Sequence, residues 1–178
     1  MTMQKGQVGV SHDNLDGRNA TGKIREIVQH SPICFFVTSK RTPGSSGARP
    51  MTVQRVDDKG NLWFISAIDS HKDQELSQNP EVALYFQSSE HSEYLEIHGR
   101  ASISQDKEKI DELWHPLFDA WFDGGKEDPR VSVIRVEPAE GHYWDSEHSN
   151  VSGGMHGFVS NFFLQPVESG PAEGGLRP

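Results

Sequence analysis

Apolar and polar residues alternate in short runs through the middle of this chain, a pattern that indicates β-strands with one buried face. Residues 51–56 and 62–65 show this pattern on either side of the polar run 57–61. Gly60 in that run supplies the positive φ that a tight connection needs, so the two runs are predicted to pair as a β-hairpin. Further strands are predicted over residues 33–38, 82–86, 94–103, 131–136 and 141–144.

Helical spacing of apolar residues appears in shorter stretches between these runs. It predicts one helix over residues 23–30. A second helix is predicted over residues 70–78, with Ser70 as its N-cap and Asp73 at the fourth place of a capping box. Residues 79–80, Asn-Pro, end this second helix because the residue before a proline avoids the helical conformation.

The longest helical pattern covers residues 106–122, where apolar side chains form one continuous face. These side chains are Ile110, Leu113, Trp114, Leu117, Phe118, Trp121 and Phe122. Pro116 lies inside the pattern, and a proline in a helix interior lacks the N–H for an intrahelical hydrogen bond. We therefore expect a kink or a break at Pro116.

These elements predict a mainly β protein with flanking helices (α+β), built as a small barrel of six or seven strands. Residues 19–145 are predicted to form the single folded domain. Residues 1–18 and 146–178 are rich in polar residues and glycine and lack regular periodicity, so both are predicted to be flexible tails.

Composition narrows the class of protein. The chain has 178 residues, enough for one hydrophobic core, and it has no apolar run long enough to span a membrane. Its net charge of -9 argues against general binding to nucleic-acid backbones. Cys34 is the only cysteine and no secretory signal is visible at the N-terminus, so we expect a cytoplasmic protein without an internal disulfide.

The candidate chemistry is an anion site made by Arg49 and Lys72. In the predicted hairpin, Arg49 lies near the end of the second strand, and Lys72 follows at the start of the next helix. A guanidinium fork and an ammonium group at a helix N-terminus together suit a phosphate group. The alternative is that both are solvated surface cations, as Arg and Lys usually are.

Seven spaced segments resemble the FMN-binding split-barrel proteins related to pyridoxamine 5'-phosphate oxidase, specifically the general stress protein 26 group. The segments are RPM (49–51), GNLWF (60–64), DSHK (69–72), NPEVALYF (79–86), HGRA (98–101), DELWHPLFDAWFDGG (111–125) and RVEPAEGHYWD (135–145). The resemblance runs from about residue 22 to residue 145. It implies a split β-barrel that forms a homodimer and binds flavin mononucleotide (FMN) at the subunit interface.

The resemblance also implies the residues that contact the FMN. One subunit is expected to contribute Arg49, Pro50, Met51, Phe64, Ile65, Ser66, Ser70 and Lys72, and the partner Gln87, Ser88 and Trp121. Ser66 stands where the family usually has threonine, so the hydroxyl is kept. Ser70 is expected either to donate to the phosphate or to cap the helix. The helical periodicity leaves Trp121 equally compatible with packing in the core.

The implied function is that of a flavin-dependent oxidoreductase acting on a small molecule, with a nicotinamide or oxygen as partner. The alternatives are a flavin-binding protein that stores or senses FMN without turnover, and a cofactor-free interaction module. Oxidation of vitamin B6 phosphates is disfavoured because the chain after Arg135 lacks that enzyme's basic C-terminal signature. No metal site is expected, because no His or Cys pair has ligand spacing, and no catalytic residue is assigned.

Overall fold

The computed structural model describes residues 14–39, 41–88, 93–145 and 172–178. These residues form a nine-stranded sheet in the order β1-β9-β8-β7-β6-β2-β3, with β5 joined to β8 and β4 joined to β5. The strands are β1 (Leu15–Asp16), β2 (Ile33–Thr38), β3 (Ala48–Thr52), β4 (Arg55–Val56), β5 (Leu62–Ala67), β6 (Glu81–Ser88), β7 (Glu93–Ser104), β8 (Val131–Asp145) and β9 (Ala172–Arg177).

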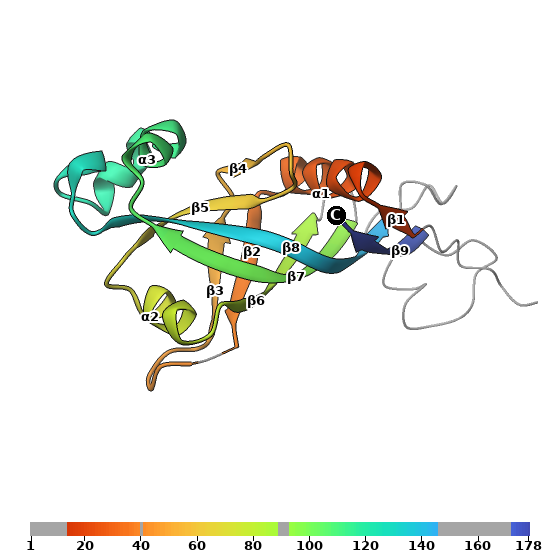
Figure 1. Cartoon of the computed structure of the whole chain (residues 1–178), viewed down its shortest axis with the longest axis horizontal. Helices are drawn as coiled ribbons and strands as arrows, with labels where there is room; N and C mark the ends of the chain where they lie inside the picture. The colour runs from red at the N-terminus through yellow and green to blue at the C-terminus, as the bar shows by residue number, and fades with distance from the viewer. Residues whose placement is uncertain (1–13, 40, 89–92, 146–171) are drawn as a thin grey trace, which may run out of the picture.

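The sheet curves around one core but does not close. β3 pairs only with β2, and β5 pairs only with β4 and β8, so among the described strands no ladder joins β3 to β5. In Figure 1 the long strands β7 and β8 cross the strands β2, β3 and β6. This arrangement confirms the predicted mainly β split barrel, although the described residues form nine strands and not six or seven. The barrel is open between β3 and β5.

The helices lie outside this barrel. They are α1 (Arg18–His30), α2 (His71–Gln78) and α3 (Lys107–Leu113), followed by the 3₁₀ segments η1 (Pro116–Ala120) and η2 (Gly125–Glu127). Figure 1 shows α1 beside β1 and β9 at one end, and α3 at the opposite end. Within the described ranges, no helix combines the length and apolar composition that a membrane crossing requires.

The break predicted at Pro116 is confirmed. α3 ends at Leu113, and Trp114 and His115 take extended conformations before Pro116 opens η1. His115 caps η1, because its Nδ1 accepts a hydrogen bond of 3.2 Å from the Leu117 amide. The apolar face of residues 106–122 is thus split into two short helices that pack on the same side of the sheet.

The structure differs from the two predicted tails at the inner end of the first and at the outer end of the second. Helix α1 already begins at Arg18, and β1 precedes it. Residues 172–177, predicted as part of a flexible tail, form β9, which pairs with β8 and with β1. Leu176 is only 1% exposed and belongs to the main core. Local sequence gives no sign of this strand, because its stability depends on the distant edge of β8. Residues 1–13 and 146–171 lie outside the described ranges.

The predicted hairpin over residues 51–65 is wrong in its first strand. The chain turns after Thr52, so that β3 pairs with β2 and only the two residues of β4 pair with β5. The tight connection itself is as predicted, with Gly60 at φ 85°. The Asp57 carboxylate stabilises it by accepting hydrogen bonds from the amides of Lys59 (2.9 Å) and Asn61 (3.0 Å).

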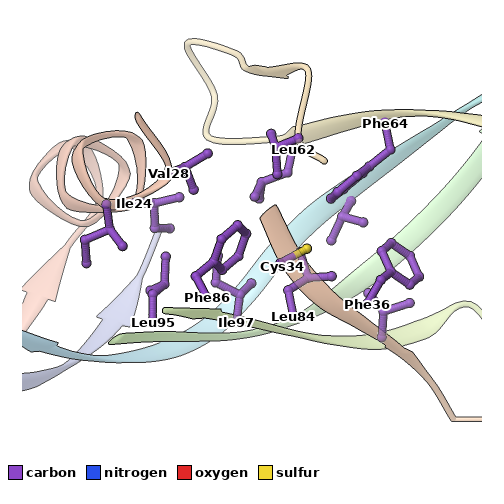
Figure 2. Close-up of a cluster of buried hydrophobic side chains, with 14 of the residues drawn as sticks. Ile24, Val28, Cys34, Phe36, Leu62, Phe64, Leu84, Phe86, Leu95 and Ile97 are labelled. Carbon is purple, nitrogen blue, oxygen red and sulfur yellow. The ribbon is translucent and has the colours of Figure 1, made fainter. Parts of the chain in front are cut away.

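The core lies between the inner face of the barrel and helix α1. Figure 2 shows side chains from α1, β2, β5, β6 and β7 pointing toward one another, and Phe36 and Phe64 meet edge to face at 5.4 Å. A second cluster lies under α3 and η1. It contains Ile65, Ile110, Leu113, Phe118, Phe122, Val131 and Val133.

The two strands predicted over residues 131–136 and 141–144 form a single strand, β8, which contains a β-bulge. His98 of β7 faces Glu140, whereas its neighbour Gly99 faces Pro138, so Ala139 is the extra residue. A bulge accommodates Pro138, which has no N–H to donate to the ladder. Gly99 is required here, because a Cβ at this position would lie 2.4 Å from the Glu137 carbonyl oxygen.

Substitution of this glycine gives a direct test of the bulge. Gly99→Ala is expected to lower the free energy of unfolding by about 1–3 kcal/mol, since backbone atoms of β8 must move away from the new methyl group. Gly22→Ala is the matched control: Gly22 lies inside α1 with nothing within 4 Å of its added Cβ. It should stabilise by about 0.5–1 kcal/mol. Urea denaturation of both variants measures these effects, and equal responses would contradict the assigned bulge.

Candidate functional site

Helix α2 carries the centre of the candidate site. It begins immediately after β5, and Ser70 is its N-cap, accepting a hydrogen bond of 3.3 Å from the Asp73 amide as predicted. The Ser70 hydroxyl donates to the Asp73 carboxylate at 3.1 Å. Of the two expected roles of Ser70, the structure therefore shows the capping role.

Lys72 lies in the first turn of α2 and is 9% exposed. Its ammonium group donates hydrogen bonds to the hydroxyls of Ser66 and Ser70, the latter at 3.0 Å, and lies 3.4 Å from Asp73 Oδ1. Burial lowers the pKa of Lys72, and the positive charge of Arg49 lowers it further, whereas Asp73 raises it. Lys72 is thus a buried, anchored cation and not a solvated surface residue.

Arg49 reaches the same helix from β3. Its guanidinium donates to Glu75 Oε2 at 2.8 Å, to Ser45 Oγ at 3.0 Å and to Thr38 Oγ1 at 3.3 Å. Glu75 lies one turn after Lys72 on α2, so the two predicted cations converge on adjacent turns of one helix. The two predicted cations therefore lie close together. Arg49 is held there by hydrogen bonds to Thr38 on β2 and Glu75 on α2, and not by the predicted hairpin.

Glu75 is the group that holds Arg49 in place, and its side chain is 1% exposed. It also accepts hydrogen bonds from Thr38 Oγ1 (2.6 Å) and from the Thr42 amide (2.7 Å). Burial raises the pKa of Glu75, but these hydrogen bonds and that of Arg49 lower it by more, so the pKa falls from 4.5 to about 2. Glu75 is therefore ionised at neutral pH.

This shift predicts an acid-sensitive contribution to stability. Because the folded-state pKa of Glu75 lies below its unfolded value, its contribution is present above about pH 5 and is lost as the pH falls toward 2. The shift corresponds to on the order of 3 kcal/mol. We expect the difference in unfolding free energy between the wild type and Glu75→Gln to shrink steadily from pH 5 to pH 2, measured by chemical denaturation. A difference independent of pH would contradict this role.

Asp73, the residue after Lys72, connects helix α2 to strands β5 and β8. It is 2% exposed and accepts hydrogen bonds from Ser66 Oγ at 2.6 Å and from Ser132 Oγ at 2.8 Å. Ser66 and Ser132 face each other across β5 and β8. The carboxylate therefore fixes the start of α2 to the end of β5 and to the start of β8.

The opening between β3 and β5 contains a pocket, here called the split pocket, with a volume of about 370 Å³. It is lined by Pro50, Met51, Thr52, Gln54, Ile65, His115, Leu117, Phe118 and Trp121. Neither cation lines the pocket itself, but Pro50 follows Arg49 directly on β3, and Ile65 precedes Ser66, the hydrogen-bond partner of Lys72, on β5. The pocket is therefore next to the cation pair along both strands. An apolar pocket next to a fixed pair of cations suits a ligand with a flat ring system and an anionic tail.

The structure brings together most of the residues predicted for one subunit. Pro50, Met51 and Ile65 line the split pocket, whereas Phe64 is fully buried in the main core and can offer a ligand only its backbone. Trp121, which the resemblance assigned to the partner, is 73% exposed and lines the split pocket of its own chain.

Gln87 and Ser88 lie apart from this group. They end β6, and Gln87 lines a different pocket of about 500 Å³ on the outer face of β2 and β6. Ser88 is 4% exposed. Within one chain neither residue belongs to the cation site, so their contribution to a partner's site stays a prediction.

Sequence reasoning missed the two carboxylates that organise the site. Glu75 lies three residues after Lys72, a spacing that places both on one side of a helix, but only the fold shows that Arg49 reaches it. Asp73 was predicted only as a capping residue. Among the described residues, no group of three or more His, Cys, Asp or Glu side chains is placed to hold a metal ion.

Comparisons with known proteins show the family to which the chain belongs. Residues 19–162 match the family model described as pyridoxamine 5'-phosphate oxidase like. General stress protein 26 of Bacillus subtilis is 26% identical over 121 residues, covering 66% of this chain and 83% of that protein. Protein bli-3 of Neurospora crassa is 31% identical over 129 residues, covering 67% of this chain and 62% of that protein.

Solved structures show the same fold. The structure of the general stress FMN/FAD binding protein from Xanthomonas citri is 27% identical, with a TM-score of 0.62 over 75% of this chain and 93% of that one. The incompletely closed barrel places this chain in the class of split-barrel proteins. The chain belongs to the pyridoxamine 5'-phosphate oxidase-like family, as the resemblance predicted, and it is similar to the general stress protein 26 members of that family.

Proposed function

We propose that this protein binds FMN, with the phosphate at Arg49 and Lys72 and the ring in the split pocket. The observation that carries the proposal is the convergence of these two cations on α2, directly beside that pocket. The description of the Xanthomonas citri relative as an FMN/FAD binding protein supports it.

The residues present fit the phosphate of FMN. The phosphate carries close to two negative charges, and the site offers a guanidinium, an ammonium group and the N-terminus of α2. Because Glu75 and Asp73 already fix these cations, few side-chain rotamers have to be ordered when the anion binds. The Ile65 and Ser66 backbone, at the end of β5, would offer polar groups to the edge of the ring.

A bound flavin supplies hydride or single-electron transfer. The protein's own residues then position the ring, exclude water from the split pocket and bind a second molecule beside it. We propose that the protein is a flavin-dependent oxidoreductase with a small-molecule substrate and a nicotinamide as electron donor. The alternative is a protein that stores or senses FMN without turnover.

Purification followed by absorbance spectroscopy and FMN titration tests the proposal. We expect a flavin spectrum, or saturable uptake of added FMN, and FMN-dependent consumption of NADPH in the presence of an electron acceptor. Flavin binding without such consumption would favour storage or sensing. A colourless protein that takes up no FMN would overturn the proposal.

We further propose that two copies of the chain associate through the outer face of β2 and β6. Ile33, Phe35 and Tyr85 on this face are 57%, 59% and 43% exposed, an unusual amount of apolar surface for neighbouring strands. Gln87 lines the pocket on the same face. In such a dimer, this pocket and the residues Gln87 and Ser88 would lie close to the flavin bound by the partner subunit.

Charge substitution on this face tests the association. Phe35→Asp is expected to convert the dimer to a monomer, because an unpaired carboxylate would be buried in an apolar interface. Light scattering after size-exclusion chromatography measures the mass. Ile68→Asp is the control, since Ile68 is 41% exposed but lies in the turn after β5. If both variants keep the wild-type mass, or if the wild type is a monomer, the proposed interface is wrong.

We propose the cytoplasm as the location of the protein. Cys34 is buried, and burial raises the pKa of its thiol to about 12, so a reactive thiolate does not form at neutral pH. A reducing compartment suits a protein of this composition. Fractionation of cells followed by immunodetection would check this location.

A further inference from the structure

One wall of the split pocket consists of η1 and the residues next to it. Leu117 and Trp121 are 75% and 73% exposed, whereas Phe118 between them is 9% exposed and belongs to the second core cluster. The buried Phe118 ring lies 5.5 Å from the Trp114 ring and 6.1 Å from the Trp121 ring. These contacts hold Trp121 beside the opening, where it presents a large apolar surface to the pocket.

The charge of the pocket restricts what this wall can bind. Of its nine lining residues, all within the described ranges, His115 is the only one with a titratable side chain. Neither Lys nor Arg lines it, and the two cations beside it, Arg49 and Lys72, are assigned to the phosphate of FMN. With FMN bound, a phosphorylated or carboxylated compound would therefore find no free guanidinium or ammonium group to pair with. An uncharged ligand loses nothing by the absence of such a partner.

His115 supplies one directed hydrogen-bond donor. Its Nδ1 accepts from the Leu117 amide at 3.2 Å in capping η1. In the neutral imidazole one nitrogen accepts and the other carries the hydrogen, so the donor is Nε2. The pocket therefore combines an exposed indole with an imidazole N–H whose tautomer is fixed by the fold.

We propose that the η1 wall of the split pocket binds a flat, uncharged aromatic carbonyl compound. Its ring would pack against Trp121 and Leu117, and its carbonyl oxygen would accept a hydrogen bond from His115 Nε2. This inference rests on the proposed function in one respect: the compound would be the small-molecule substrate of the flavin bound on the β3 and β5 side of the same pocket.

A matched pair of ligands and variants tests the inference. The probes are 1-indanone and indane, which share a fused ring system but differ in the carbonyl group, added to full-length protein supplied with FMN and followed by saturation-transfer NMR. We expect His115→Asn to weaken 1-indanone binding about two- to tenfold, the loss of one hydrogen bond, and to leave indane binding unchanged. Asparagine keeps the cap on η1 but lacks the Nε2 donor.

Two further variants separate specific from general effects. Trp121→Ala is expected to weaken both probes by about tenfold or more, because the packing surface is lost. His98→Asn is the control, since His98 lies on β7 and pairs with Glu96 at 2.7 Å, outside the pocket. Equal binding of both probes to the wild type, or equal responses of His115→Asn and His98→Asn, would overturn the inference.

The FMN titration keeps this result apart from the proposed function. If FMN binds and 1-indanone does not, the substrate inference fails and the flavin proposal stands. If FMN does not bind, the flavin proposal fails, and titration of the flavin-free chain with 1-indanone then decides the inference by the same criteria. In the FMN-loaded protein, pyridoxal 5'-phosphate, a flat but phosphorylated aldehyde, should not compete with 1-indanone, and competition there would contradict the charge argument.

Discussion

Removal of both cations of the phosphate site is expected to weaken FMN binding by about 3–6 kcal/mol, or roughly 10²- to 10⁴-fold, because two charge-assisted contacts of about 1.5–3 kcal/mol each are lost. Arg49→Ala alone would not separate weaker FMN binding from loss of stability. It would leave Glu75 buried without its cation, and breaking one side of a buried pair destabilises the fold.

The sharper variant therefore changes both partners. Arg49→Met with Glu75→Gln removes the guanidinium and the buried negative charge together, and Lys72→Met removes the second cation. Glu75→Gln alone is the matched control. It should keep most of the FMN affinity, because the glutamine carbonyl oxygen can still accept the hydrogen bond from Arg49. Quenching of flavin fluorescence at fixed ionic strength gives the dissociation constants, and circular dichroism checks that each variant is folded.

Riboflavin provides a second control, because it has the same ring and no phosphate. We expect the wild type to prefer FMN over riboflavin strongly and the cation variants to lose this preference while their riboflavin affinity stays unchanged. If FMN and riboflavin affinities fall together, the variants have damaged the ring site or the fold. If neither falls, the phosphate is bound elsewhere and the assignment of Arg49 and Lys72 is wrong.

Asp73→Ala is expected to lower the free energy of unfolding by about 3–5 kcal/mol. The carboxylate is 2% exposed and accepts hydrogen bonds from Ser66, Ser70 and Ser132, besides its contact with Lys72. Its removal would leave the Lys72 ammonium buried next to Arg49 without its nearest countercharge. A change of this size would unfold a marginally stable domain in part, even at room temperature.

Urea denaturation measures this loss, and Asp58→Ala is the control. Asp58 is a carboxylate in the turn after β4, fully exposed, with one contact of 3.5 Å to Arg25. Because exposed ion pairs contribute at most about 1 kcal/mol, Asp58→Ala should leave the midpoint nearly unchanged. Similar midpoints for the two variants would contradict the role of Asp73 as the anchor between α2, β5 and β8.

Several features near the cation site were predicted correctly because they depend only on residues close together in the sequence. The predicted start of α2 at Ser70 depends only on neighbouring residues, because a capping hydroxyl acts on amides within one turn. The same holds for Gly60 in its turn and for the break at Pro116. These features were predicted from sequence because the interactions responsible span fewer than about five residues.

Long-range pairings were predicted less well. The alternation of residues 51–56 is compatible with a strand, but it does not say whether β2 or β5 is the partner. The chain pairs β3 with β2 and leaves the opening beside β5 that becomes the split pocket. The strand β9 was missed for a related reason, since its hydrogen bonds depend on an edge of β8 about 30 residues earlier in the chain.

The sequence by itself determined the class of fold, the position of most helices and strands, and the two cations of the candidate site, because periodicity, caps and motif spacing are local properties. Only the tertiary structure decided which strands pair, that Glu75 and Asp73 hold the cations, and that Trp121 lies beside Met51 and Ile65. The reason is physical: Arg49 and Glu75 are 26 residues apart in the sequence, and only the pairing of strands and the packing of α2 bring their side chains within hydrogen-bond distance.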